Sequence, residues 1–82
     1  MQINLTKANK VTLEKEISEL KSHLSTAEQE LKKLGDDMKM ADLFEDTAEK
    51  ETIRTMRDNL LNEITELENQ LSTKEAEYEA LS

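Results

Sequence analysis

The sequence predicts an all-α protein in which two long helices form an antiparallel coiled-coil hairpin with an acidic tip. The chain of 82 residues has no proline, one glycine and 37% charged residues, a composition typical of long solvated helices. Its apolar residues recur at steps of three and four, as they do along the buried face of a coiled coil. This pattern changes phase across residues 40–49. One straight helix therefore cannot carry both halves of the apolar pattern.

The first helix is expected over about residues 9–41. Its apolar residues alternate steps of four and three, in the run Leu13, Ile17, Leu20, Leu24, Ala27, Leu31, Leu34, Met38 and Ala41. The start is ambiguous, because the first five residues alternate in polarity and Thr6, Asn9 and Thr12 all suit an N-cap. Gly35 costs about 1 kcal/mol relative to Ala inside a helix. The apolar pattern stays in phase through Gly35, so one continuous helix is predicted, locally weakened at the glycine.

The second helix is expected over about residues 47–81, after a tip of about residues 42–46. Asp46 and Glu49 have the spacing of a capping box, with an acid as the cap. Acids in a first turn also suit the positive end of the helix dipole. The apolar run comprises Ile53, Leu60, Ile64, Leu67, Leu71, Tyr78 and Leu81, with Arg57 and Lys74 at positions of the same seam.

Antiparallel pairing leaves two registers open. One places Leu31 beside Leu60, with the bend between Glu45 and Asp46. A register shifted by one heptad moves the bend towards Asp42. A parallel homodimer of one bent helix is the structural alternative, disfavoured because the phase change lies near the middle of the chain. The hairpin has a single thin seam, so association of two hairpins into a homodimer, as a four-helix bundle, also stays open.

The bulk composition limits the classes of function. The net charge of −8 argues against a free-standing nucleic-acid binder, which needs a basic surface. The absence of cysteine excludes disulfides and cysteine-based metal sites. With no long apolar run and no signal peptide, a cytoplasmic protein with no membrane contact is expected. A disordered acidic chain is the remaining alternative, disfavoured by the strict apolar periodicity.

Negative charge is densest at the bend, where residues 35–50 carry six acids and two lysines. Asp42 and Glu45 are three residues apart, and carboxylate oxygens are ligands suited to Mg²⁺. The alternative is that these acids are helix caps and solvated charge. Leu43 and Phe44 between them are either a plug that closes the hairpin or a contact for a partner. A lone His23 supports no metal or catalytic role, and the sequence contains no self-contained active site.

Three stretches together resemble the N-terminal coiled-coil domain of Gre-type transcript cleavage factors of bacterial RNA polymerase. Residues 5–8 read Leu-Thr-Lys-Ala, and a Leu-x-x-Glu-Ile-x-x-Leu pattern begins at Leu13. Residues 42–49 read Asp-Leu-Phe-Glu-Asp-Thr-Ala-Glu, similar to the family's tip, Gly-Asp-Leu-x-Glu-Asn-Ala-Glu-Tyr. An Ile-x-x-Leu-Glu-x-x-Leu pattern from Ile64 is similar to the family's second helix. The resemblance covers nearly the whole chain.

The chain departs from the family pattern at several positions. Ala41 stands where the family usually has Gly, and Lys50 where it has Tyr. One extra residue lies between Glu45 and Ala48, and Asp36 and Asp37 add charge below the tip. The chain ends where the family's globular C-terminal domain begins, so that domain is expected to be absent.

The resemblance implies a mechanism in which the hairpin enters the secondary channel of RNA polymerase. Asp42 and Glu45 would then lend their carboxylates to a second Mg²⁺ for hydrolysis of backtracked RNA. In that mechanism the enzyme would be the polymerase, and the isolated chain would bind no cofactor. Leu43, Phe44 and Asp46 would contact the partner. Arg54 matches a basic position of the family and would lie near the RNA 3′ end, or else is an exposed helix charge.

Three other functions remain open at the level of sequence. A Gre-like inhibitor would occupy the same channel without stimulating cleavage, and the extra Asp36, Asp37 and Asp46 favour it. A structural coiled coil or assembly adaptor would carry the acidic bend as solvated charge only. An acidic mimic of nucleic acid would bind basic protein grooves and lose that binding steeply as salt rises.

Overall fold

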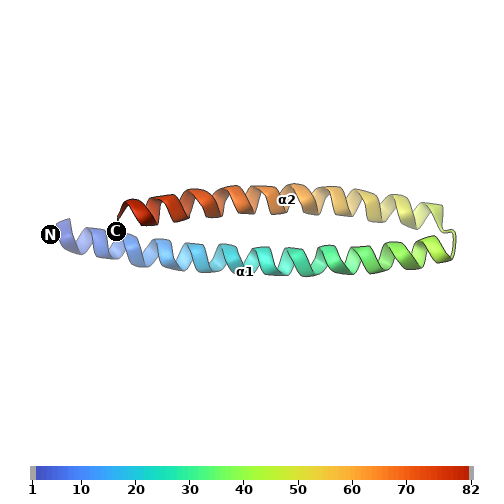
Figure 1. Cartoon of the computed structure of the whole chain (residues 1–82), viewed down its shortest axis with the longest axis horizontal. Coiled ribbons are helices and arrows are strands. Elements are labelled where there is room, and N and C mark those ends of the chain that lie inside the picture. Colours follow the sequence, from blue (N-terminus) through green and yellow to red (C-terminus); the bar gives the residue numbers. More distant parts are fainter. Residues whose placement is uncertain (1, 82) are drawn as a thin grey trace.

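The computed structural model describes residues 2–81, and side chains over residues 9–81. The described residues form two helices, α1 (Gln2–Leu43) and α2 (Thr47–Ala80), which run antiparallel and side by side (Figure 1). The Cα atoms span 65 × 14 × 13 Å, so the molecule is a thin rod with one bend. Neither of the described helices is long and apolar enough to cross a membrane. The predicted all-α helical hairpin is confirmed.

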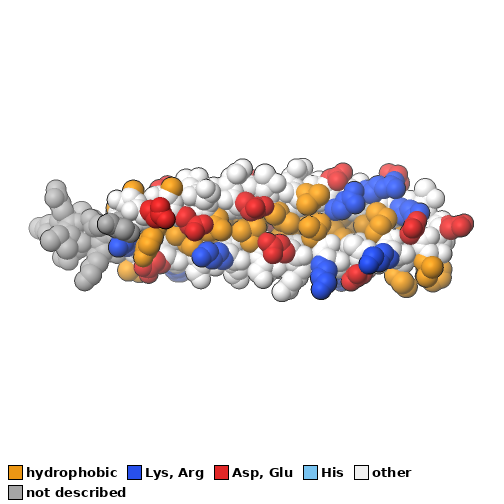
Figure 2. Space-filling view, viewed as in Figure 1, with side chains coloured by type: hydrophobic (Ala, Val, Ile, Leu, Met, Phe, Trp, Pro, Cys, Tyr) orange, Lys and Arg blue, Asp and Glu red, His pale blue; other side chains and the backbone are white. Residues whose placement is uncertain are grey.

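The core is a single seam between the two helices. All nine apolar positions predicted for α1 are buried or half-buried, whereas the positions between them are mostly exposed. Hydrophobic side chains follow the line between the helices in Figure 2. Arg57 occupies a seam position of α2 but is exposed, because its long side chain keeps the guanidinium in water. The buried cluster comprises Leu24, Ala27, Leu34, Ala41, Ile53, Leu60 and Ile64.

Contacts at the open end of the hairpin fix the pairing register. The Tyr78 hydroxyl donates to Glu14 Oε1 at 2.8 Å, and Lys74 Nζ lies 2.7 Å from Glu16 Oε2. The ammonium of Lys10 lies 5.4 Å from the centroid of the Tyr78 ring. The Tyr78–Glu14 pair is centred on residue 46 of the sequence, and the Lys74–Glu16 pair on residue 45. The structure therefore has the first of the two registers, and the register shifted by one heptad is wrong.

The first helix begins earlier than the sequence indicated. The expected start near Asn9 is wrong, because α1 already begins at Gln2. Asn9 and Thr12 lie inside the helix and do not cap it, and the side chain of Thr6 lies outside the described ones. No proline or glycine precedes Gly35 to stop the helix, and extending a formed helix costs little.

The helix continues through Gly35 to Leu43, as the in-phase apolar pattern predicted. Gly35 has no positive φ, and a Cβ added there would meet no atom within 4 Å. Neither backbone conformation nor lack of space therefore requires glycine at this position. The tip of residues 42–46 is shorter than expected, because the first two of those residues complete the last turn of α1.

Candidate functional site

The bend is a tight connection of residues 44–46. At the end of α1, the Asp46 N–H donates to Ala41 O at 2.9 Å, and the Glu45 N–H donates to Asp42 O at 3.1 Å. This pair of bonds is a Schellman motif, which ends a helix with one residue in the left-handed conformation. Glu45 takes that conformation, with φ of 54°. Glycine is the usual residue there, because it carries no Cβ.

The same segment starts α2. Asp46 is the N-cap, and its Oδ1 accepts the Glu49 N–H at 3.1 Å. The predicted Asp cap is therefore confirmed. The reciprocal bond of a capping box is replaced, because the Asp46 N–H already donates to Ala41 of the preceding helix. One residue thus closes α1 and opens α2, which holds the bend to three connecting residues.

The first predicted metal ligand is already engaged. The Asp42 carboxylate forms an ion pair with the Lys50 ammonium, which reaches across the bend from the first turn of α2. Asp42 lies in the last turn of α1, where the helix dipole disfavours a negative charge. Lys50 offsets that cost and ties the two helices together. The Lys50 side chain is only 25% exposed, whereas that of Asp42 is 71% exposed.

This ion pair changes the chemistry of Asp42. The hydrogen bond from Lys50, and then the charge of its ammonium, hold the pKa of Asp42 below its ordinary value of 3.8. The carboxylate therefore stays ionised at lower pH than a free aspartate does. A metal ion that uses Asp42 as a ligand therefore has to displace Lys50 or share the carboxylate with it.

The second predicted ligand has a different environment. Glu45 is exposed at the apex of the bend, and among the described side chains its carboxylate has no hydrogen bond or ion pair. Residues 9–81 contain no group of three or more His, Cys, Asp or Glu side chains arranged to hold a metal ion. Mg²⁺ retains several waters and is often held by one or two carboxylates together with groups from another molecule. Glu45 fits such a shared site directly, and Asp42 fits it once released from Lys50.

The apolar side chains of the bend do not plug the hairpin. Leu43 is 74% exposed and Phe44 is 72% exposed, although larger apolar side chains normally gain free energy by burial. Met40, one turn earlier on α1, is also exposed. Figure 2 shows hydrophobic side chains gathered again at the bend end of the rod. Of the two predicted roles for Leu43 and Phe44, the plug is wrong, and contact with a partner stays a prediction.

Arg54 lies two turns into α2 and belongs to the surface of the rod. Its Nη1 atom is 3.2 Å from Glu51 Oε1, and the side chain is 55% exposed. An exposed pair of this kind contributes well under about 1 kcal/mol to stability. Arg54 is therefore available to a partner at little cost, and nothing in the fold requires it.

Sequence reasoning missed two residues of the site, Lys50 and Met40. Lys50 was noted only as a departure from the family pattern. Its role was readable in part, because it lies three residues before Ile53 and so continues the α2 seam towards the bend. Met40 lies next to the seam residue Ala41 but faces outward. Its part in the site depends on the direction of the chain after Leu43, which periodicity does not report.

Comparisons of the chain with protein-family models, with curated proteins and with solved structures found no match.

Proposed function

We propose that this hairpin is a transcription elongation factor of the Gre type. It would enter the secondary channel of bacterial RNA polymerase and stimulate cleavage of backtracked RNA. A rod 65 Å long with a bend of three connecting residues has the shape for reaching a recessed site. The resemblance of residues 42–49 to the family's tip supplies the identity of that partner.

The observation that carries the proposal is the conformation of Glu45. A residue with a Cβ in the left-handed region costs about 1–2 kcal/mol, and glycine at this position would avoid that cost. Unfavourable backbone conformations that persist in proteins cluster at functional sites. The side chain retained at that cost is a carboxylate at the apex, without a bond to any described side chain. An apical free carboxylate is the group that a shared Mg²⁺ site requires.

The chemistry would be hydrolysis of a phosphodiester at the polymerase active centre. The bound Mg²⁺ supplies Lewis acidity and a water of lowered pKa. Glu45 would hold the ion from the apex, and Asp42 would add a second oxygen after leaving Lys50. Leu43 and Phe44 would contact the channel wall and exclude water around the two carboxylates. Their exposure in the free chain supports this role, because burial against a partner would lower the free energy of the complex.

The test is a transcript cleavage assay on stalled, backtracked bacterial elongation complexes. The wild-type chain is expected to shorten the RNA in the presence of Mg²⁺, and Asp42→Asn/Glu45→Gln to leave it intact. The double variant keeps the size and hydrogen-bonding capacity of both side chains while removing their charge. Equal activity of wild type and variant would contradict the carboxylate role. Absence of both cleavage and polymerase binding would leave a structural interaction module.

The ion pair between Lys50 and Asp42 favours a second candidate function, inhibition of polymerase by occupation of the channel. A tip whose first carboxylate is already neutralised lends fewer ligands to a metal. Lys50→Gln separates the two functions. For a cleavage factor, the variant frees Asp42 and is expected to cleave at least as fast as wild type. For an inhibitor, wild type slows nucleotide addition, and no variant at position 50 yields cleavage.

A further inference from the structure

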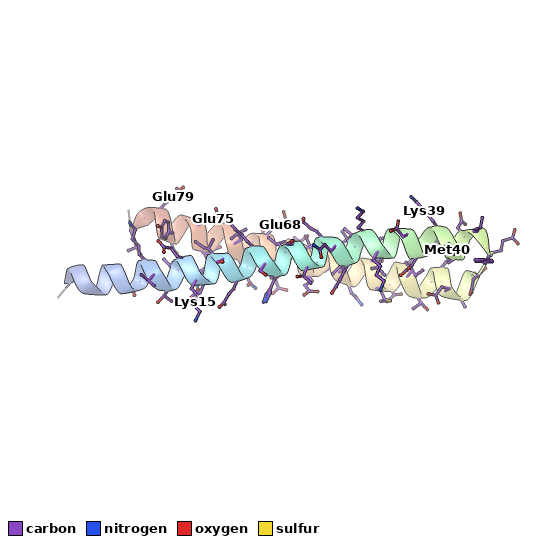
Figure 3. The ribbon with its side chains drawn as sticks, turned by 90° about the horizontal axis from the view of Figure 1, so that it is seen from below. Lys15, Lys39, Met40, Glu68, Glu75 and Glu79 are labelled. Carbon is purple, nitrogen blue, oxygen red and sulfur yellow. The ribbon has the colours of Figure 1, made fainter. Side chains whose placement is uncertain are left out.

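A shallow groove lies at the bend, where the end of α1 meets the start of α2. We name it the bend groove, and it is lined by Asp37, Met40, Ala41, Phe44, Asp46 and Glu49. Figure 3 places Met40 on α1 close to the bend. Neither Asp42 nor Glu45 lines the groove, and neither does Lys50. The bend groove is therefore a separate surface from the carboxylates proposed to hold Mg²⁺.

The bend groove combines exposed apolar side chains with a rim of one charge sign. Met40 is 56% exposed and Phe44 is 72% exposed, whereas Ala41 between them is buried. The rim consists of Asp37, Asp46 and Glu49, and no lysine or arginine lines it. Exposed apolar side chains within a charged rim are typical of sites that bind another protein.

Four other grooves of the described rod differ from it. The groove around Met56 has Lys33 in its lining, so its rim carries both signs of charge. The grooves at the open end contain Lys21 or Lys74. A fourth groove is acidic, but its larger apolar residues belong to the seam between the helices. Of these grooves, the bend groove is the one that combines an exposed aromatic ring with a purely acidic rim.

We infer that the bend groove is a docking site for a protein segment that presents an apolar side chain flanked by lysine or arginine. The apolar side chain would pack between Met40 and Phe44, and the basic residues would face Asp37, Asp46 and Glu49. Aromatic anchors supply much of the affinity of such contacts, and complementary charge fixes orientation and speeds encounter. The inference deepens the proposed function, on which it rests for the identity of the partner. It needs no metal.

The docking chemistry is tested with two peptides of equal charge. One alternates arginine with leucine, and the other replaces each leucine with serine. Amide chemical shifts of the labelled chain are followed during titration at physiological salt. The leucine peptide is expected to shift the amides of residues 37–49 and to bind about tenfold or more tightly than the serine peptide. Equal binding of both peptides, or shifts spread over all acidic residues, would overturn the inference by showing charge attraction alone.

Matched variants test the groove itself. Met40→Ser and Phe44→Ser are each expected to weaken binding of the leucine peptide by about tenfold. Met56→Ser is the control, because Met56 is 51% exposed but lies outside the bend groove. All three positions are exposed, so the variants are expected to fold, which circular dichroism checks. Weakening by Met56→Ser as large as that by Met40→Ser would contradict the inference.

A third measurement separates this inference from the proposed function. Affinity for bacterial RNA polymerase is measured for wild type, Met40→Ser and Asp42→Asn/Glu45→Gln. The groove variant is expected to lose affinity, and the carboxylate variant to bind but not to stimulate cleavage. Polymerase binding that Met40→Ser leaves unchanged would refute the bend groove alone, because the proposed function does not use Met40. Absence of polymerase binding by wild type, with selective binding of the leucine peptide, would refute the proposed function and retain the groove.

Discussion

Asp42 and Glu45 are both carboxylates and lie three residues apart, but only one of them is neutralised by a neighbouring cation. Asp42 is paired with Lys50, and Glu45 is held at the apex by a backbone conformation that its side chain disfavours. The first arrangement stabilises the hairpin, and the second costs free energy. Asp42 therefore contributes to folding, whereas the Glu45 carboxylate is exposed and available to a partner.

Replacing Glu45 with glycine is expected to stabilise the hairpin by about 1 kcal/mol, because glycine adopts a positive φ without steric cost. Urea unfolding followed by circular dichroism measures the change. The same variant is expected to lose transcript cleavage, since it removes the apical carboxylate. Glu49→Gly is a control for glycine itself, because that residue lies in the first turn of α2 and should lose stability. A destabilised Glu45→Gly chain would contradict the assigned backbone conformation.

Removing the Lys50 ammonium is expected to lower stability at neutral pH and to change its pH dependence. The pKa of Asp42 in the folded chain lies below 3.8, so the pair stabilises the hairpin above that pH. That contribution is lost as pH falls through the depressed pKa. The gap in unfolding free energy between wild type and Lys50→Gln should therefore close on acidification below 3.8.

Urea unfolding of both chains at neutral pH and below 3.8 gives the comparison. Arg57→Gln removes one exposed cation without touching Asp42, and so controls for net charge. A gap between wild type and Lys50→Gln that persists unchanged in acid would show that Lys50 acts through packing of its aliphatic stem.

At the scale of the helices, periodicity predicted most of what the structure shows. The apolar steps of three and four are a local property, and every predicted seam position of α1 is buried or half-buried. The ends of the helices were harder to predict from the sequence. The start at Gln2 was missed, because several good capping residues lay within a segment that nothing prevents from being helical. The start of α2 was predicted correctly, since Asp46 bonds locally to the Glu49 N–H.

Gly35 has the lowest helix propensity in α1, and its replacement is expected to raise stability. Gly35→Ala is expected to raise the unfolding free energy by about 1 kcal/mol, because alanine restricts the unfolded chain and favours helix. A Cβ at this position meets no atom within 4 Å, so no steric cost opposes the gain. Chemical denaturation of the two chains measures the difference. A loss of stability would indicate that the helix is interrupted at Gly35.

At the scale of the whole molecule, stability rests on one seam. Ile53 is 2% exposed and is the least exposed of the buried core residues. A thin hairpin has little stability in reserve, so each buried side chain contributes a large part of the total. The packing of this seam therefore holds the ends of α1 and α2 together on either side of the bend.

Ile53→Ala is expected to cost about 2–5 kcal/mol and to unfold much of the chain. Met56→Ala, one turn away on the same helix but 51% exposed, is expected to change stability by less than about 0.5 kcal/mol. Thermal unfolding followed by circular dichroism compares the two. Similar effects of both substitutions would contradict a core confined to the seam between α1 and α2.

The sequence by itself determined the two helices, their seam and the place of the bend, because apolar spacing along a helix depends only on residues three and four apart. It left the register open between two choices, which contacts such as Tyr78 with Glu14 decided. Only the tertiary structure brought Lys50 to Asp42 and formed the bend groove. Both depend on the direction that the chain takes at Glu45, in a conformation that its residue type disfavours. The conformational preference of a glutamate therefore disfavours the backbone geometry that shapes the candidate site.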